Sequence, residues 1–323
     1  MRLYTTLQLG VLLSIILLIF YLYTVRTINS SVGLEEYIEE QDLISNEVVT
    51  ENIYFTRNDI VVAVVACGDR LHETLNMLKS ALMFSQTKLN FIVVAEDRLI
   101  DSFNEKNILK DVDSILYMDS DTLFLTPVET VWEHFHKFNA TQMAALVPEH
   151  EDPNVGWYNR FAKHPYYGKL GVNSGVMLMN LTRMRAFQWK EYVVPIYKKY
   201  KLKITWGDQD IINIIFHYHP DKLYIYSCRF NYRPDHCMYT SVCKQAEKEG
   251  VAVIHGSRGF FHSEKQPVFQ AVYRSFEEFH LGGDVYKDFY QQLESYLESA
   301  QNNNCGHVKD IFLKNIRKYL DLD

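Results

Sequence analysis

The chain has 323 residues, of which 47% are hydrophobic and 23% charged, a composition that excludes a disordered chain and predicts a globular protein with a sizeable core. Its formal net charge of −7 leaves no surplus of cations to displace counterions from a nucleic acid, so no nucleic-acid partner is expected. The length suits one large or two small domains.

The N-terminal segment is long, apolar and uncharged. Residues 7–25 (LQLGVLLSIILLIFYLYTV) span about 19 positions, enough for a helix to cross the roughly 30 Å hydrocarbon core of a membrane. A cleaved signal peptide is the alternative, but its apolar part usually has about 7 to 15 residues and a small-residue cleavage site should follow. The sequence Thr-Val-Arg-Thr follows instead. We expect a cytoplasmic tail over residues 1–6 and an uncleaved signal-anchor helix over residues 7–25.

Residues 26–58 form an acidic stretch with little apolar periodicity, which predicts a solvated stem before a folded domain over residues 59–323. Arg2 and Arg26 flank the apolar span evenly, so these charges do not orient it. Sequons for N-glycosylation, which act only in a secretory lumen, occur at Asn29, Asn139 and Asn180. They favour a single-pass type II protein of the Golgi or endoplasmic reticulum with a luminal C-terminal domain.

The chain contains five cysteines, and Cys228, Cys237 and Cys243 lie close together in the sequence. In an oxidising compartment this clustering favours one disulfide, and the odd count leaves at least one thiol unpaired. A zinc site is the weaker alternative because paired Cys-x-x-Cys motifs are lacking. Cys67 ends an apolar run and is expected to be a small buried hydrophobic residue.

From residue 59 onward, continuous apolar runs alternate with amphipathic segments, which predicts an α/β fold with a largely parallel sheet covered by helices. A stripe of leucines at helical spacing marks a crossover helix after the first strand. The stripe consists of Leu71, Leu75, Leu78 and Leu82. Another helix is expected around 211–216, and helices resume after about Asp284. The predicted strands are 59–67, 90–97, 114–118, 143–147, 175–179, 223–227 and 251–255.

Polar residues follow several of these runs, at the edge where open α/β sheets bind their ligands. Asp119 and Asp121 come directly after one run, and two carboxylates at this spacing can converge on a hard cation if the chain turns. His255 and Gly256 follow another run, with Lys265 shortly after them. Imidazole suits Mn²⁺, glycine lets backbone approach a ligand, and an ammonium group pairs with phosphate, so a metal diphosphate is the expected guest. Taken singly, these residues could also be an acidic turn, a core histidine and a solvated lysine.

These residues carry a family resemblance. The sequence resembles glycosyltransferase family 8, and most closely the glucoside xylosyltransferases of the secretory pathway. The motifs Asp-x-Asp, Asn-Ser-Gly, Gly-Asp-Gln-Asp and His-Gly-to-Lys-Gln-Pro occur in the family's order within the matching stretches 64–81, 112–128, 146–184, 198–216 and 229–269. The resemblance implies a GT-A, Rossmann-like fold that binds a nucleotide sugar. It further implies retaining transfer of xylose from UDP-xylose, with Mn²⁺ as the usual cation, to glucose O-linked on EGF-like repeats of Notch-type receptors in an alpha-1,3 linkage.

The resemblance also implies roles for individual residues. Asp119, Asp121 and His255 match the metal ligands, and Lys265 would help to neutralise charge on the departing UDP. Asp208 and Gln209 match residues beside the transferred sugar, where Gln209 would support an oxocarbenium-like centre. A covalent double displacement stays open, as does a mere helix-capping role for Asp208. The residues that match the nucleotide and sugar pocket are Val65, Ala66, Cys67, Gly68, Asn173, Ser174, Gly175, Gly256 and Lys265.

Other features bear on acceptor, sugar choice and activity. An aromatic and basic stretch that could hold the acceptor, with some members in the core, comprises Trp157, Tyr158, Arg160, His164, Tyr166 and Tyr167. Residues that could select xylose by excluding the hydroxymethyl group of glucose are Tyr158, Trp206 and His262. Members of the family usually have a longer segment, with a basic helix that reaches the donor, where this chain has only residues 97–113. The alternative to an active enzyme is therefore an inactive isoform or paralogue that binds nucleotide, metal or a partner without transfer.

Overall fold

The computed structural model describes residues 26–29, 59–95, 109, 111–300 and 302–322, and its centre is a seven-stranded sheet. The strand order is β1-β3-β2-β4-β7-β6-β8. The bounds are β1 Arg26–Asn29, β2 Ile60–Ala66, β3 Leu89–Ala95, β4 Ser114–Met118, β6 Ala144–Pro148, β7 Val172–Asn180 and β8 Leu223–Ile225. Strand β2 is parallel to β3 and β4, and β6 is parallel to β8. The predicted α/β class and the first βαβ unit are confirmed.

The sheet is mixed, which corrects the expectation of a largely parallel one. Strand β7 is antiparallel to both β4 and β6, and β1 is antiparallel to β3. Because β7 runs in the opposite direction, its first residues, 173–175, lie at the same edge as the carboxyl end of β4. The predicted strand 251–255 does not join this sheet. Instead β9 (Val253–His255) pairs with β5 (Thr122–Phe124) in a separate two-stranded antiparallel sheet.

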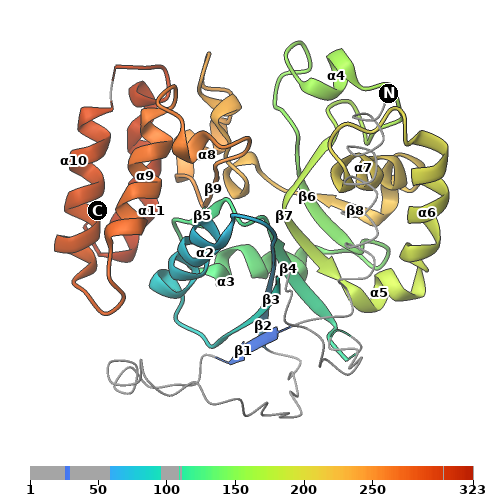
Figure 1. Ribbon diagram of the computed structural model, residues 1–323, viewed down its shortest axis with the longest axis horizontal. Helices are drawn as coiled ribbons and strands as arrows, with labels where there is room; N and C mark the ends of the chain where they lie inside the picture. Colours follow the sequence, from blue (N-terminus) through green and yellow to red (C-terminus); the bar gives the residue numbers. More distant parts are fainter. Residues whose placement is uncertain (1–25, 30–58, 96–108, 110, 301, 323) are drawn as a thin grey trace.

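Helices cover both faces of the main sheet, which is why its strands read as continuous apolar runs. Val62 and Val64 of β2 pack on the side of helix α2, whereas Val61 and Ala63 belong to a cluster on the opposite face. Helices α9, α10 and α11 lie together on one side of the molecule, and α5, α6 and α7 lie on the other (Figure 1). The bounds are α2 Leu71–Phe84, α3 Val128–Trp132, α4 Trp157–Phe161, α5 Leu181–Ala186, α6 Trp189–Tyr200, α7 Asp208–Tyr218, α8 Lys244–Glu249, α9 Pro267–Glu278, α10 Gln291–Ser299 and α11 Lys314–Tyr319.

Helix α2 is where the leucine spacing predicted a helix, but three of the leucines do not form its buried face. Leu71, Leu75 and Leu82 are exposed, and the buried stripe contains Met77 and Ala81 instead. The reason is close packing. Small residues let the helix approach the short sheet, so that the buried Ser80 hydroxyl accepts a hydrogen bond from the backbone N–H of Phe124. Helices also resume earlier than expected, with α9 at Pro267.

Two disulfides are present, where the sequence predicted one. They join Cys228 to Cys243 and Cys237 to Cys305. The second links the loop after β8 to the segment after α10, and the four cysteines of the two bridges are all buried. Cys67 takes part in neither bridge and is exposed, so its predicted burial is wrong: strand β2 ends at Ala66, and Cys67 already belongs to the following turn.

Some predictions fall outside the described residues. They concern the tail and anchor over residues 1–25, most of the stem, and most of the short connection 97–113. Residues 26–29 of the predicted stem form β1. In the part of the chain that the structure describes, no helix has both the length and the apolar character needed to span a membrane.

Candidate functional site

Three potential metal ligands converge at the edge of the sheet where β2 and β4 end. Asp119 directly follows β4, Asp121 directly precedes β5, and His255 ends β9. One ligand atom from each of the three side chains lies within 4.8 Å of the other two. His255 Nε2 is 3.2 Å from Asp121 Oδ1 and 3.7 Å from Asp119 Oδ2. The β5–β9 pairing sets His255 opposite Thr122, and this register brings the imidazole to the carboxylates.

Burial and neighbouring charges affect the two carboxylates differently. Burial raises the pKa of Asp119, and the positive charge of a protonated His255 only partly offsets it. Burial also acts to raise the pKa of Asp121, but the charge and hydrogen bond of His255, together with Arg70, outweigh it and lower that pKa. Tyr117 donates its hydroxyl to Asp119 Oδ1 at 3.0 Å and orients this carboxylate. Two carboxylates and one imidazole nitrogen form a donor set that fits a divalent cation such as Mn²⁺.

Gly175 lets strand β7 pass directly beneath these ligands. A Cβ atom at this position would lie 2.3 Å from His255 Cε1 and 3.0 Å from Asp119 Oδ2. The Gly175 carbonyl accepts a hydrogen bond from the backbone N–H of Asp119 at 2.8 Å. The Asn-Ser-Gly motif therefore supports the ligand cluster from below.

Gln209 is the second residue of α7 and lies beside the first residues of β7, at the same edge of the sheet. Its Oε1 accepts hydrogen bonds from Asn173 Nδ2 at 2.8 Å and from the Ser174 backbone N–H at 3.2 Å. Its Nε2 donates to the Tyr158 hydroxyl at 3.2 Å, and that hydroxyl donates to Asp210 Oδ1 at 2.8 Å. The Gln209 amide is thus held at both ends.

Asp208 is the first residue of α7 and is half-buried. Burial, and then the negative charge of Asp119, raise the pKa of Asp208 to about 7. Gly207 precedes the helix with φ +61°, the left-handed region that favours glycine. Asp208 does not cap the helix, because the N-cap position is Gly207 and no side-chain hydrogen bond is made there. Asp210 Oδ2 instead accepts from the backbone N–H groups of Thr205 and Trp206, which precede α7.

Most of the predicted nucleotide-pocket residues lie at the edge of the sheet where the candidate metal ligands meet. Val65 and Ala66 end β2, next to the position where Val64 pairs with Met118 of β4. Cys67 and Gly68 follow and are exposed. Gly256 donates its backbone N–H to the Asp121 carbonyl at 2.7 Å. Their contact with a nucleotide stays a prediction.

The sequence profile of Glycosyl transferase family 8 matches residues 103–257. Glucoside xylosyltransferase 1 of Gallus gallus is 44% identical over 310 residues, covering 80% of this chain and 72% of that protein. Glucoside xylosyltransferase 2 of Mus musculus is 45% identical over 314 residues, covering 80% of this chain and 71% of that protein. The chain belongs to glycosyl transferase family 8. Among solved structures, mouse xyloside xylosyltransferase 1 in its apo form is 18% identical, with a TM-score of 0.44 over 62% of this chain and 98% of that one.

Because these alignments run over 310 or more positions but cover only 80% of a 323-residue chain, the relatives carry residues inside the aligned region that this glycosyltransferase lacks. The expected shortening of the chain relative to family members therefore has a counterpart in these alignments.

Lys265 lies on an exposed turn before α9 of the glycosyltransferase. Among the described residues, no hydrogen bond or ion pair of its ammonium group is found, and only its backbone N–H is engaged, by Ser263 Oγ. The side chain is therefore accessible to a ligand, and its role toward a diphosphate stays a prediction.

The aromatic stretch divides between core and surface. Tyr158 and His164 are buried around Asp210, whereas Phe161 is exposed and Trp157 is half-buried. Trp157 packs edge-on against Trp206 with ring centroids 5.6 Å apart. With only 1% of its surface exposed, Tyr158 is no longer a good candidate for choosing the sugar.

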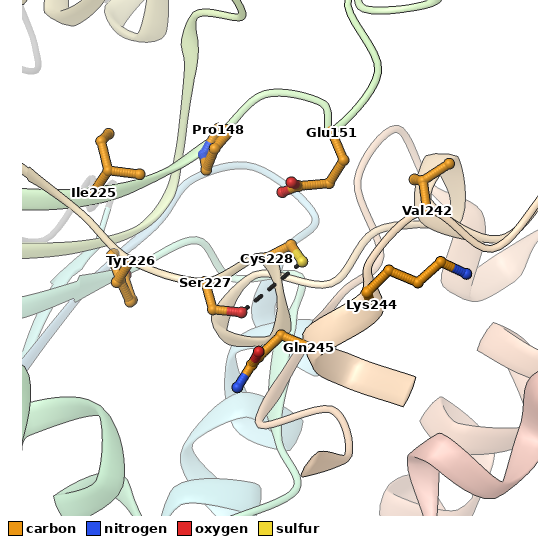
Figure 2. Close-up of a pocket in the computed structure, with 9 residues that line it drawn as sticks. All are labelled: Pro148, Glu151, Ile225, Tyr226, Ser227, Cys228, Val242, Lys244 and Gln245. Atoms are coloured by element: carbon orange, nitrogen blue, oxygen red, sulfur yellow. Dashed lines mark hydrogen bonds between the residues drawn. The ribbon is translucent and has the colours of Figure 1, made fainter. Parts of the chain in front are cut away.

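The structure also contains a cavity of about 410 Å³ after the carboxyl ends of β6 and β8. Figure 2 shows Glu151, Ser227 and Cys228 around it, with the Ser227 hydroxyl 3.9 Å from Cys228 Sγ. None of the predicted site residues lines this cavity, so it is separate from the ligand cluster.

Several residues of the site were not predicted. Tyr117 and Asn231 contact Asp119 and His255 directly, and Asn213 donates to the Tyr158 hydroxyl at 3.0 Å. The only feature of the sequence that pointed to Asn231 was its place in the stretch 229–269, which resembles the family. Glu73 is a further residue that was not predicted: it is buried, and its carboxylate bonds Arg70 and lies 2.9 Å from His262 Nε2.

Proposed function

We propose that this glycosyltransferase transfers xylose from UDP-xylose, with retention of configuration, to glucose O-linked on EGF-like repeats in an alpha-1,3 linkage. The observation that carries the proposal is the set of relatives about 44% identical that are named glucoside xylosyltransferases. It is supported by the cluster of Asp119, Asp121 and His255, which offers ligands for the divalent cation that such a donor brings with it.

The ligand cluster would act at the diphosphate. When bound, a divalent cation supplies Lewis-acid stabilisation of charge on the leaving nucleotide. Asp119, Asp121 and His255 would hold it, and the carboxylates need no change in backbone geometry because Gly175 already leaves room for them. Lys265, on its exposed turn, would add a second positive charge to the leaving group.

The other end of the site would act at the sugar. Gln209 is fixed by two donors from β7 before any substrate binds, so its amide dipole does not have to reorganise during the reaction. An ionised Asp208 beside it would stabilise positive charge that grows on the anomeric carbon. Removal of either group is expected to lower kcat more than it changes the KM for UDP-xylose.

Sugar choice is assigned to Trp206, which is 38% exposed and precedes Asp208 by two positions. Its bulk would exclude the hydroxymethyl group of glucose. Replacing Trp206 with Ala is expected to admit UDP-glucose while weakening the use of UDP-xylose only moderately. The exposed Phe161 and the half-buried Trp157 beside it would face the acceptor.

The deciding experiment is a radiolabelled transfer assay on an O-glucosylated EGF-like repeat, with UDP-xylose and UDP-glucose, with and without Mn²⁺. We expect Mn²⁺-dependent xylose transfer that Asp121→Asn abolishes without unfolding the protein. Lys265→Ala should retain Mn²⁺ binding but slow transfer by roughly 10²-fold or more. Equal or better use of UDP-glucose by the unmodified protein would refute the xylosyl assignment.

One observation favours a second function, an inactive isoform or paralogue that binds nucleotide or a partner. The relatives carry residues inside the aligned region that this chain lacks. Mn²⁺-dependent binding of UDP-xylose without any transfer, by a protein whose Asp119, Asp121 and His255 are unaltered, would establish this alternative.

For localisation we propose a type II protein of the Golgi or endoplasmic reticulum membrane, anchored by residues 7–25 with residues 59–323 in the lumen. The two disulfides support it, because such bridges persist in oxidising compartments. In sealed vesicles the domain should resist added protease until detergent is present. Degradation before detergent would refute the orientation.

A further inference from the structure

Asn231 lies between the ligand cluster and the sugar end of the site, and it is completely buried. Its Oδ1 is 2.9 Å from His255 Nδ1, and its Nδ2 donates to Asn173 Oδ1 at 2.7 Å. Asn173 Nδ2 in turn donates to Gln209 Oε1 at 2.8 Å. A continuous chain of hydrogen bonds therefore runs from His255 to Gln209 through two amides.

The direction of each bond is fixed by two backbone N–H groups, which can only donate. The Gly175 N–H points at Asn173 Oδ1 at 3.0 Å, and the Ser174 N–H points at Gln209 Oε1 at 3.2 Å. These atoms must therefore be oxygens, and Asn173 faces Gln209 with its NH₂ group. The atom of Asn231 that meets Asn173 Oδ1 must then be its NH₂ group, so its oxygen faces His255.

The consequence reaches the ligand cluster. An amide oxygen accepts but cannot donate, so His255 must carry its proton on Nδ1 to make this bond. The lone pair of the neutral imidazole is then on Nε2, the nitrogen 3.2 Å from Asp121. A metal-binding histidine needs this arrangement, in which the second ring nitrogen donates to a fixed acceptor.

We propose that Asn231 is a positioning residue with two effects: it holds His255 in the tautomer that offers Nε2 to a metal ion, and through Asn173 it orients Gln209 toward the sugar. The inference rests on the proposed metal-dependent transfer. Both effects depend on burial, since Asn173 and His255 are also buried and water is not free to replace a missing amide.

Two variants separate the two effects. Asn231→Asp keeps the size and still accepts from His255 Nδ1–H, but it cannot donate to Asn173. We expect Mn²⁺ affinity within about threefold of the unmodified protein, and a kcat for transfer at saturating Mn²⁺ that is lower by about tenfold or more. Asn231→Leu removes both bonds, and Mn²⁺ affinity should fall by about 10- to 100-fold.

Mn²⁺ affinity is measured with the metal alone, at fixed pH, from the electron paramagnetic resonance signal of free Mn²⁺. The matched control is Asn315→Leu, which removes another buried amide that bonds Arg229 and the Val251 carbonyl but not His255. This control is expected to lose stability without losing Mn²⁺ affinity. Thermal unfolding identifies any variant that fails to fold, and Asn231→Asp, which preserves volume, then still tests the branch to Gln209.

Unchanged Mn²⁺ affinity in a folded Asn231→Leu protein would overturn the role toward His255, and so would the absence of Mn²⁺ binding by the unmodified protein. Unchanged kcat in Asn231→Asp would overturn the role toward Gln209. If the unmodified protein transfers no xylose but Asn231→Leu still weakens Mn²⁺ binding, the proposed donor and acceptor are wrong and the role of Asn231 toward His255 stands.

Discussion

Gly175→Ala is the substitution whose effect follows most directly from the geometry. The added methyl carbon would lie 2.3 Å from His255 Cε1 and 2.6 Å from His255 Nδ1. Carbon atoms in contact are about 3.5 Å apart, so the imidazole would have to move by about 1.2 Å. The imidazole is not free to move away, because His255 is only 4% exposed and its Nδ1 is hydrogen-bonded to Asn231.

Overpacking of this kind costs about 1 to 3 kcal/mol in the free energy of unfolding. A functional cost is expected in addition, because a displacement near 1 Å at a reacting centre lowers a rate by about 10²-fold. Gly175→Ala should therefore fold, melt at a lower temperature, bind Mn²⁺ weakly and transfer sugar at least about 10²-fold more slowly. Differential scanning fluorimetry, Mn²⁺ titration and the transfer assay measure these quantities on one preparation.

The matched control is the next residue of the same strand. Val176 is fully buried but packs on the opposite side of β7, in the core beneath α2. Val176→Ala should cost about 2 kcal/mol of stability, similar to Gly175→Ala, and leave Mn²⁺ affinity and kcat unchanged below its melting temperature. Wild-type Mn²⁺ affinity and kcat in Gly175→Ala, or equal loss of activity in the two variants, would refute the reasoning.

Three further outcomes are expected. In the metal-free protein the pKa of Asp208 rises from 3.8 to about 7 on folding, so ionisation of this group destabilises the folded state increasingly from about pH 4 to pH 7. Asp208→Asn should therefore raise the free energy of unfolding in urea by about 1 to 2 kcal/mol at pH 8 and by nothing near pH 4, and an equal gain at both values would contradict this origin. Replacing Cys237 and Cys305 together with Ser opens a bridge of sequence separation 68 and should lower the free energy of unfolding by about 4 kcal/mol, and a loss below about 1 kcal/mol would contradict it. Asn139 is exposed, whereas Asn180 is half-buried at the end of β7, so peptide mapping after secretion should find glycan at Asn139 but not at Asn180. Glycan at Asn180 but not at Asn139 would contradict this reasoning from exposure.

The sequence predicted most strand positions but not the direction of every strand. A run such as 175–179, buried on both faces, has no feature that distinguishes a parallel from an antiparallel neighbour. The same ambiguity placed 251–255 in the main sheet, although β9 pairs with the short β5 and, at Ile254, with Tyr232. Helix α9 was not predicted, although the sequence contains a pattern typical of a helix there: Pro267 opens it, and Val268, Val272 and Phe276 follow on one buried face.

In the candidate site too, the sequence pointed to some residues and not to others. Asp119, Asp121 and His255 could be singled out because they follow apolar runs whose ends are expected at one edge of a sheet, and because their motifs occur in the order of the resembled family. Asn231 was not, because it lies in an irregular cysteine-rich loop where no periodicity indicates which side chains face inward. Its partners come from strands that are distant in the sequence, and only the three-dimensional arrangement brings the amide between Asn173 and His255.

The two disulfides are interleaved along the chain, since Cys237 lies between Cys228 and Cys243 while its own partner is Cys305. During synthesis in an oxidising compartment, Cys237 emerges well before Cys305, and translation at about 5 to 20 residues per second leaves several seconds in which its nearest thiols are the wrong ones. A non-native bridge that Cys237 makes in that interval must be broken by thiol exchange before the Cys237–Cys305 pair can form. Recombinant production should therefore respond more strongly to a co-expressed disulfide isomerase than to a stronger oxidant.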